Sequence, residues 1–292
     1  MAVADAYVAN DLIPSRSGLG TSVRQYFLGT SIPSWVAFGS LTLLMLVAVF
    51  AHVIAPYDPL VPSGTPMSAP SAAHWFGTDT VGRDVFSRVI VGMSTSWWGA
   101  VAVVGSGVFI GGLVGLVAGA AGGVIDMVLM RLTDVFLALP APILALTVVA
   151  ALGPSYGHTL LGVAVMWWPL YTRIVRAEVR RLRVSPHMEA ARLAGAGLRR
   201  QLTRHLLPGA VPVTIVTASL DISALVLMLS GLSFLGLGAP QPAPELGAMS
   251  AQGMYNIFTA WWIPILPAVG VMVIAIVSNF AGDALRDRIR DR

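Results

Sequence analysis

The stretch Glu189-Ala190-Ala191-Arg192-Leu193-Ala194-Gly195 is followed, after nine residues, by His205-Leu206-Leu207-Pro208. Long apolar runs lie on both sides, so this arginine-rich stretch is predicted to lie in water between two membrane spans. Residues 186–194 are predicted to form a short helix whose alanines make a smooth face that another protein can approach closely. Glycines at 195 and 197 interrupt it, because glycine is unfavourable inside a helix and favourable at a turn.

A second amphipathic segment follows this turn. Leucines at positions 198, 202 and 206 fall on one side of it, and arginines at 199, 200 and 204 fall on the other. Pro208 and Pro212 mark the beginning of the next apolar run. The whole stretch is therefore predicted to be a helix–turn–helix beneath a membrane domain, shaped to contact a cytosolic partner.

The composition supports the membrane assignment. Of 292 residues, 56% are apolar and 11% are charged, and the mean hydropathy is +0.77, which is typical of a polytopic membrane protein. The chain has no cysteine, which excludes disulfides and thiolate chemistry. It also has no lysine, so it cannot form a Walker A phosphate-binding loop. The pI near 10 follows from membrane topology and does not indicate a nucleic-acid partner.

Six membrane spans are predicted, which makes the chain an all-α polytopic membrane protein. They cover residues 34–55, 96–121, 127–150, 158–176, 211–233 and 261–281. The predicted organisation is a cytoplasmic N-terminal arm at 1–32 and a transmembrane domain at 33–292, with an outer loop at 56–94, a cytoplasmic loop at 177–210 and a second outer loop at 234–260. All arginines except Arg83 and Arg88 fall on one side, so both termini are predicted to be cytoplasmic.

The first outer loop contains a distinctive polar segment. Its marked residues are Gly77, Thr78, Asp79, Gly82, Arg83, Asp84, Ser87 and Arg88. Residues 85–90 are predicted to form an interfacial helix that turns apolar side chains to one face and polar ones away from it. One interpretation is a helix with Asp/Arg pairs and a capping Thr or Asp. Direct contact of Asp79 or Asp84 with a ligand stays an alternative.

Two charged features are predicted near or within the spans. Asp126, Arg131 and Asp134 are expected to form ion pairs at the cytoplasmic edge. Asp221 lies ten residues into the fifth span, where a carboxylate costs a few kcal/mol and must face protein, water or a partner. It lines a translocation path, or it makes a structural polar contact, within the chain or with a second subunit, or it is a protonated acid, and the sequence leaves these readings open.

The motif around Glu189 resembles the EAA motif of ABC-importer permeases, which reads Glu-Ala-Ala, three residues, Gly, nine residues, Ile, one residue, Leu-Pro. His205 stands at the Ile position, similar to a variant of the dipeptide and oligopeptide branch (C-type subunit). The segment at 77–88 and the segment Leu232–Gly238, with the prolines after it, also resemble signatures of that branch. The resemblance implies the type I importer permease fold. It further implies an outer docking surface at 234–260, for which the alternative is a re-entrant turn.

The same resemblance implies the site and the assembly. The residues expected to couple to an ATPase subunit are Glu189, Ala190, Ala191, Gly195, His205, Leu207 and Pro208. Expected partners are a second permease subunit, two ATPase subunits or a fused pair, and an extracytoplasmic substrate-binding protein. The chain itself is expected in a bacterial inner (plasma) membrane. ATP and Mg are expected on the partner subunits, with no cofactor or metal in this chain.

The resemblance points to import of dipeptides or oligopeptides, while nickel, glutathione or another small ligand stays open. Leu229 stands where many family members carry an acid, so substrate preference is not transferred. A proton- or cation-coupled secondary transporter using Asp221 is the alternative class. An intramembrane enzyme would need paired catalytic residues at matched depth, and the sequence contains no such pattern. The chain is therefore expected to be a transport subunit and not an enzyme.

Overall fold

The computed structural model describes residues 34–290, and within that range the chain is helical, with no β-strand. The predicted arm at 1–32 lies outside the described residues. The helices are α2 (Ser34–Val49), α3 (Ala51–Ile54), α4 (Val85–Ala121), α5 (Gly123–Leu137), α6 (Ala141–Leu152), α7 (Tyr156–Arg183), α8 (Pro186–Leu193), α9 (Leu198–Gln201), η1 (Leu202–Leu206), α10 (Leu207–Leu232), η2 (Ser233–Leu237), α11 (Leu246–Gly253), η3 (Met254–Asn256) and α12 (Trp262–Arg290).

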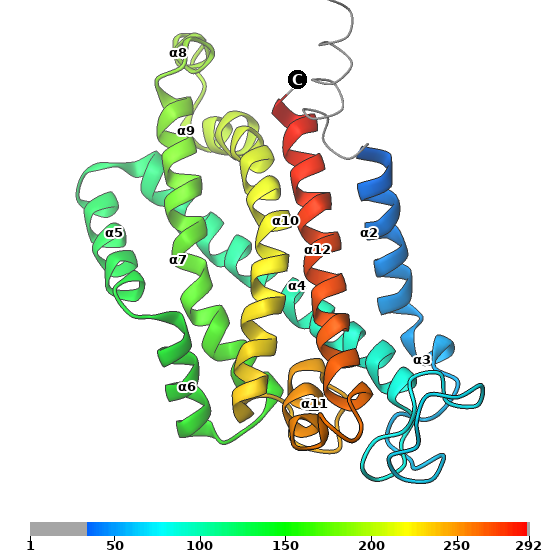
Figure 1. Ribbon diagram of the computed structural model, residues 1–292. Helices are drawn as coiled ribbons and strands as arrows, with labels where there is room; N and C mark the ends of the chain where they lie inside the picture. The colour runs from blue at the N-terminus through cyan, green and yellow to red at the C-terminus, as the bar shows by residue number, and fades with distance from the viewer. Residues whose placement is uncertain (1–33, 291–292) are drawn as a thin grey trace, which may run out of the picture.

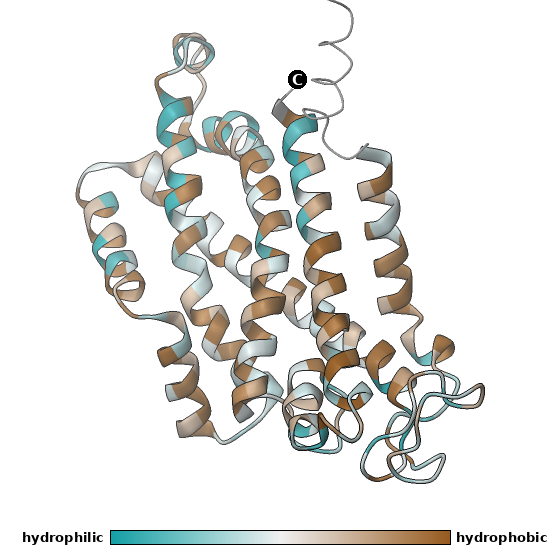
Figure 2. Cartoon of the chain, viewed as in Figure 1, coloured by the Kyte–Doolittle hydropathy of each residue, from teal (hydrophilic) through white to brown (hydrophobic). Residues whose placement is uncertain are grey.

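The helices form a bundle with two distinct ends (Figure 1). One end, called the α8 end here, holds α8, the beginning of α2 and the close of α12. The opposite end, the α11 end, holds α11 and the long loop between α3 and α4. Hydrophobic residues predominate along the helices between these ends, whereas hydrophilic residues gather where α7 and α12 approach the α8 end (Figure 2).

Helix α4 corrects the predicted boundary of the first outer loop. It is continuous over 37 residues and crosses the bundle obliquely. At 1.5 Å per residue it is about 55 Å long, well beyond the roughly 30 Å of a bilayer core. The expected interfacial helix is therefore the first part of α4, and the loop ends at 84 and not at 94. Arg83, Asp84 and Ser87, which were expected to turn away from the apolar face, are buried, because the loop folds over them.

Helices α4 and α7 touch through their backbones. Glycines recur every fourth residue along α4, at 107, 111, 115 and 119, and all four face α7. A Cβ atom at Gly111 would lie 2.1 Å from the carbonyl oxygen of Trp168, and one at Gly115 would lie 2.6 Å from that of Thr172. Such contacts require residues without a side chain, as is common where membrane helices approach closely.

The predicted third span is broken. It divides into α5 and α6, which meet at an angle of 79°. Pro140 lies at the break. A proline disfavours the helical conformation of the residue before it, and it has no N–H to donate to a helical hydrogen bond. The fifth predicted span is, by contrast, longer than expected, since helical structure runs without a gap from Leu198 to Leu237. The second segment of the predicted cytoplasmic loop is therefore continuous with this span.

By length and composition, three helices among the described residues can cross a membrane, or four if α5 and α6 make one span. The three are Val85–Ala121, Leu198–Leu237 and Trp262–Ile289. Helix α2 is apolar but has only 16 residues. The structure thus supports the all-helical membrane fold, and the count of six spans stays a prediction.

Candidate functional site

Helix α8 ends at the predicted glycine. Pro186 occupies its first turn, where the missing N–H of proline costs nothing. Gly195 has φ +76°, and its N–H donates to the carbonyl of Arg192 at 2.9 Å while the N–H of Ala196 donates to that of Ala191 at 3.0 Å. This pair of bonds is a Schellman motif, which needs a residue with left-handed backbone conformation after the helix and therefore favours glycine. The predicted helix and its glycine turn are confirmed.

The outer surface of α8 is available for contact. Glu189 and Ala190 are exposed, Ala191 is half-buried, and Leu193 is 85% exposed. Val184, just before the helix, is 86% exposed. Exposed apolar side chains beside small residues favour a protein partner at this surface.

One side chain holds α8 against the bundle. Met188 is fully buried and packs in a small apolar cluster with Val175 and Val179 of α7, Leu206 of η1 and Ala210 of α10. This anchor was missed in the sequence, although Met188 is the large unbranched apolar residue in the first turn of the helix. The cluster connects α8 directly to the two helices that flank it.

The second half of the motif lies at the same end. His205 in η1 is half-buried, and its ring centroid lies 6.2 Å from that of His187 on α8. Leu207 and Pro208 are exposed at the beginning of α10. The two halves of the motif thus meet through the rings of His187 and His205, and which of the seven residues expected to form the coupling loop contact a partner stays a prediction.

Ion pairs join α5 to the second half of α7. Asp126 of α5 binds Arg176 of α7 through two hydrogen bonds, and Asp134 accepts from Arg173 at 2.7 Å. The predicted ion pairing of the two acids is confirmed, with α7 as the partner helix, whereas Arg131 forms no ion pair within the described residues. Glu178 pairs with Arg181, and this hydrogen bond raises the pKa of Arg181 above its usual value.

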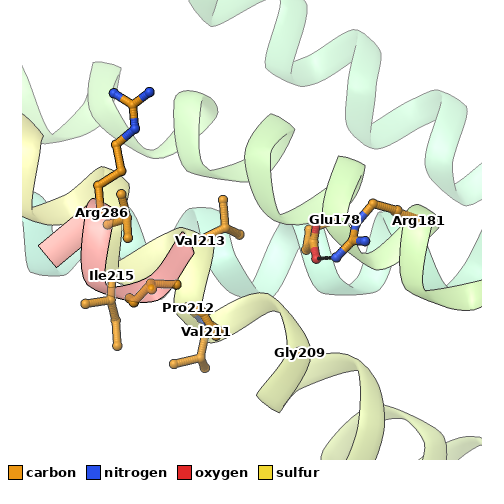
Figure 3. A pocket seen from close by; sticks show the side chains of 10 residues that line it. Glu178, Arg181, Gly209, Val211, Pro212, Val213, Ile215 and Arg286 are labelled. Carbon is orange, nitrogen blue, oxygen red and sulfur yellow. Dashed lines mark hydrogen bonds and ion pairs between the residues drawn. The ribbon is translucent and has the colours of Figure 1, made fainter. Parts of the chain in front are cut away.

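A cavity of about 760 Å³ opens between the ends of α7, α10 and α12 (Figure 3). Val211, Pro212 and Ile215 of α10 make its apolar floor, with the Glu178–Arg181 pair on one side and Arg286 on the other. The sequence spacing suggests an ion pair between Asp283 and Arg286, but the described residues contain no such pair. The guanidinium of Arg286 is exposed instead.

At the α11 end, the polar segment of the first outer loop forms a buried network. The carboxylate of Asp79 accepts from Nε of Arg83 at 2.6 Å and from the N–H groups of Val81 and Arg83, both at 2.9 Å. Arg88 is 2% exposed, and its Nη1 donates to the carbonyls of Pro59 at 2.6 Å and Pro242 at 3.2 Å. Arg88 thus joins α4 to both outer loops.

Asp84 caps α4. Its Oδ2 accepts from the N–H and the hydroxyl of Ser87 at 2.7 and 2.8 Å, and its Oδ1 lies 2.9 Å from Nδ1 of His74. The predicted Asp/Arg pair and capping aspartate are therefore confirmed. Both carboxylates are occupied by groups of the chain itself, and direct ligand contact by either of them stays a prediction.

The same segment is fixed to α12. Thr78 donates through Oγ1 to the carbonyl of Thr65 at 2.6 Å and accepts at its own carbonyl from Nε1 of Trp262 at 3.1 Å. Gly77 and Gly82 have φ values of +71° and +87°, and a Cβ atom at either would lie within 2.5 Å of a backbone oxygen. His74, Trp262 and Pro242 were missed in the sequence, because their role depends on chain segments far away.

Asp221 lies on the face of α10 that meets α7. Its Oδ2 accepts from the hydroxyl of Tyr171 at 2.7 Å and from Nε1 of Trp167 at 3.2 Å. These bonds agree with the expectation that an intramembrane carboxylate faces protein. Whether it also lines a translocation path stays a prediction.

The second outer loop folds back on the bundle. Leu246, Met249 and Ser250 of α11 are buried, which fits the re-entrant alternative for this part of the loop. Glu245 caps α11: its carboxylate accepts from the N–H groups of Gly247 at 3.1 Å and Ala248 at 2.9 Å. Burial raises the pKa of the Glu245 carboxyl, although these two hydrogen bonds oppose the shift.

Replacing Glu245 with alanine should lower the free energy of unfolding by about 1–3 kcal/mol, because two buried N–H groups lose their acceptor. Thermal unfolding of the purified chain in detergent measures the loss. Glu245→Gln keeps an acceptor oxygen and should recover a large part of it. Equal unfolding temperatures for wild type and Glu245→Ala would show that the cap is dispensable.

Known proteins resemble this chain in sequence and fold. Residues 111–291 match the family described as binding-protein-dependent transport system inner membrane component. A probable D,D-dipeptide transport system permease protein, DdpC of Escherichia coli K12, is 38% identical over 248 residues, covering 85% of this chain and 83% of that protein. The dipeptide transport system permease protein DppC of Alkalihalophilus pseudofirmus is 38% identical over 252 residues, with 85% and 82% covered.

Two further similarities extend the comparison. The glutathione transport system permease protein GsiD of Escherichia coli O6:K15:H31 is 39% identical over 249 residues, covering 85% of this chain and 82% of that protein. A crystal structure of an amino acid ABC transporter with histidines shares the fold, with a TM-score of 0.55 over 71% of this chain and 95% of the other at 16% identity. The chain therefore belongs to the family of binding-protein-dependent transport system inner membrane components.

Proposed function

We propose that this chain forms half of the translocation path of an ATP-driven importer for dipeptides or oligopeptides. The observation that carries the proposal is the exposed α8, held by Met188 between α7 and α10 in a chain of this family. A short helix seated on two long ones can receive a displacement and pass it to them as a rigid-body shift.

The energy source lies outside this chain. The chain has no lysine for a phosphate-binding loop. ATP and Mg therefore bind partner subunits, and the proposed importer has two such ATPase subunits. A second permease subunit completes the path, and an extracytoplasmic binding protein delivers the substrate to the α11 end. The chain crosses the bacterial inner membrane six times with both termini in the cytoplasm. The common position of α8, the beginning of α2 and the close of α12 supports this topology.

The substrate class rests on the relatives. Two of them are named as dipeptide permeases at 38% identity over most of their length. Glutathione is the second candidate, because a permease named for it is 39% identical over a similar range. Glutathione is itself a small peptide, so both candidates need a path that accepts a short, polar backbone.

Changing the coupling loop should uncouple transport without unfolding the chain. Glu189→Arg reverses the charge of an exposed side chain, and Gly195→Pro replaces a residue at φ +76° with one confined near −65°. Both should reduce peptide uptake and substrate-stimulated ATPase about fivefold, the lower end of typical coupling energies. The measurement is uptake of labelled dipeptide into vesicles that contain the complex purified with its partners.

Gly197→Ala is the matched control, because Gly197 has φ −66° and an added Cβ there meets no atom within 4 Å. It should transport like the wild type. Normal uptake by both Glu189→Arg and Gly195→Pro would contradict the coupling role. Uptake that needs a proton gradient and no ATPase partner would instead support the secondary transporter.

A further inference from the structure

Helices α7 and α10 hold the two ends of the coupling loop, and they are joined at three levels along their length. At the α8 end, they share the apolar cluster around Met188, and Gly209 of α10 lies against Leu182 of α7. At the α11 end, the hydroxyl of Thr159 on α7 donates to the carbonyl of Leu237 at the close of η2. Between these contacts lies Asp221.

The middle contact is the one that fixes how the two helices align. Asp221 of α10 accepts from Tyr171 at 2.7 Å and from Trp167 at 3.2 Å, and these two donors lie one helical turn apart on α7. Apolar contacts have no directional requirement. Two directional hydrogen bonds to one carboxylate oxygen lose their geometry after a small axial shift.

Tyr171 is itself held in place by α4. Its side chain is fully buried, and its ring lies against the glycine row of α4. A Cβ atom at Gly107 would lie 3.0 Å from Cδ2 of this ring. The ring therefore fills the contact between α4 and α7 while its hydroxyl reaches α10. One side chain thus connects three long helices at mid-height, and Asp221 is the acceptor that completes the connection.

We propose that Asp221 is a positioning residue that locks α10 to α7, so that a displacement of α8 moves both helices together. The proposal rests on the proposed function, in which a partner ATPase supplies that displacement. Without the lock, α8 would shift α7 and α10 unequally, and ATP hydrolysis would continue while less substrate moved per ATP. Asp221 acts here through α7 and needs no contact with substrate.

The lock itself can be tested without nucleotide, substrate or partner. The chain has no cysteine, so cysteines introduced at Leu161 on α7 and Leu227 on α10, both exposed, give one spin-label pair in the full chain in nanodiscs. Double electron–electron resonance should show a broader distribution of label-to-label distances in Asp221→Leu and in Tyr171→Phe than in the labelled chain without these substitutions. Asp221→Asn keeps an acceptor oxygen and should restore the narrow distribution.

Thr217→Val is the matched control on α10, because among residues 34–290 the Thr217 hydroxyl bonds only to the carbonyl of Val213 in its own helix. It should leave the distribution unchanged. An unchanged distribution in Asp221→Leu would overturn the lock, whatever the complex transports. Failure of the wild-type complex to couple uptake to ATP would instead overturn the proposed function and leave the distance result standing.

The assembled complex separates positioning from substrate binding. A positioning role predicts that Tyr171→Phe and Asp221→Leu both lower the substrate moved per ATP about tenfold, within the usual range of coupling energies, at unchanged KM. A raised KM in Asp221→Asn with normal transport in Tyr171→Phe would overturn the proposal and make Asp221 a substrate ligand.

Discussion

Gly111→Leu should prevent the chain from accumulating as a folded protein. A Cβ atom at this position would lie 2.1 Å from the carbonyl oxygen of Trp168 and 2.8 Å from Cβ of Tyr171. The carbonyl oxygen belongs to the backbone of α7 and cannot rotate away, so the two helices must separate. Separation removes the contacts of all four glycines in the row, and the cost should exceed the roughly 1–3 kcal/mol of ordinary overpacking.

Gly112→Leu is a close control, because it adds the same side chain to the next residue of α4. An added Cβ there meets no atom within 4 Å. Size-exclusion chromatography of the detergent-solubilised chain should show a folded peak for wild type and Gly112→Leu. For Gly111→Leu we expect aggregate or no protein. A normal peak for Gly111→Leu would mean that α4 and α7 do not meet as described.

Met188→Asn should abolish transport while the membrane domain stays folded. Met188 is fully buried among apolar side chains, and an amide there would lack hydrogen-bond partners at a cost of about 1–3 kcal/mol. Helix α8 has eight residues, too few to be stable without its tertiary contact. We therefore expect α8 to leave its seat and uptake to fall to background.

Met188→Leu conserves volume and polarity and should retain at least half of the uptake, since such exchanges typically cost less than about 1.5 kcal/mol. Labelled dipeptide uptake and ATPase activity of the purified complex give the two readouts. Substantial uptake by Met188→Asn would show that α8 does not need this anchor to work.

The features that the sequence predicts well depend on neighbouring residues alone. The short helix at 186–194 is observed as Pro186–Leu193, because proline at its first turn and glycine after its last are local signals. Asp84 as the cap of α4 is another such case. The EAA motif likewise depends on spacing along the chain, so the sequence alone identifies its residues.

The features that escape the sequence depend on distant contacts. Whether Asp79 and Arg88 face water or the interior is decided by a loop that folds over them. The anchoring role of Met188 depends on α7 and α10 meeting beneath it. The length of α4 was underestimated because its polar first turn reads as a surface segment until its partners at Pro59 and Pro242 are known.

The buried network around Arg88 has a consequence for biosynthesis. Arg88 needs the carbonyl of Pro242, and Thr78 is bound by Trp262, although both partners leave the ribosome more than 150 residues later. Since chains emerge from the N-terminus, the first outer loop cannot close until the last helix has entered the membrane. Until then the hydrogen bonds from Arg88 to Pro242 and from Trp262 to Thr78 cannot form, so a chain truncated before Pro242 leaves this loop without either of them.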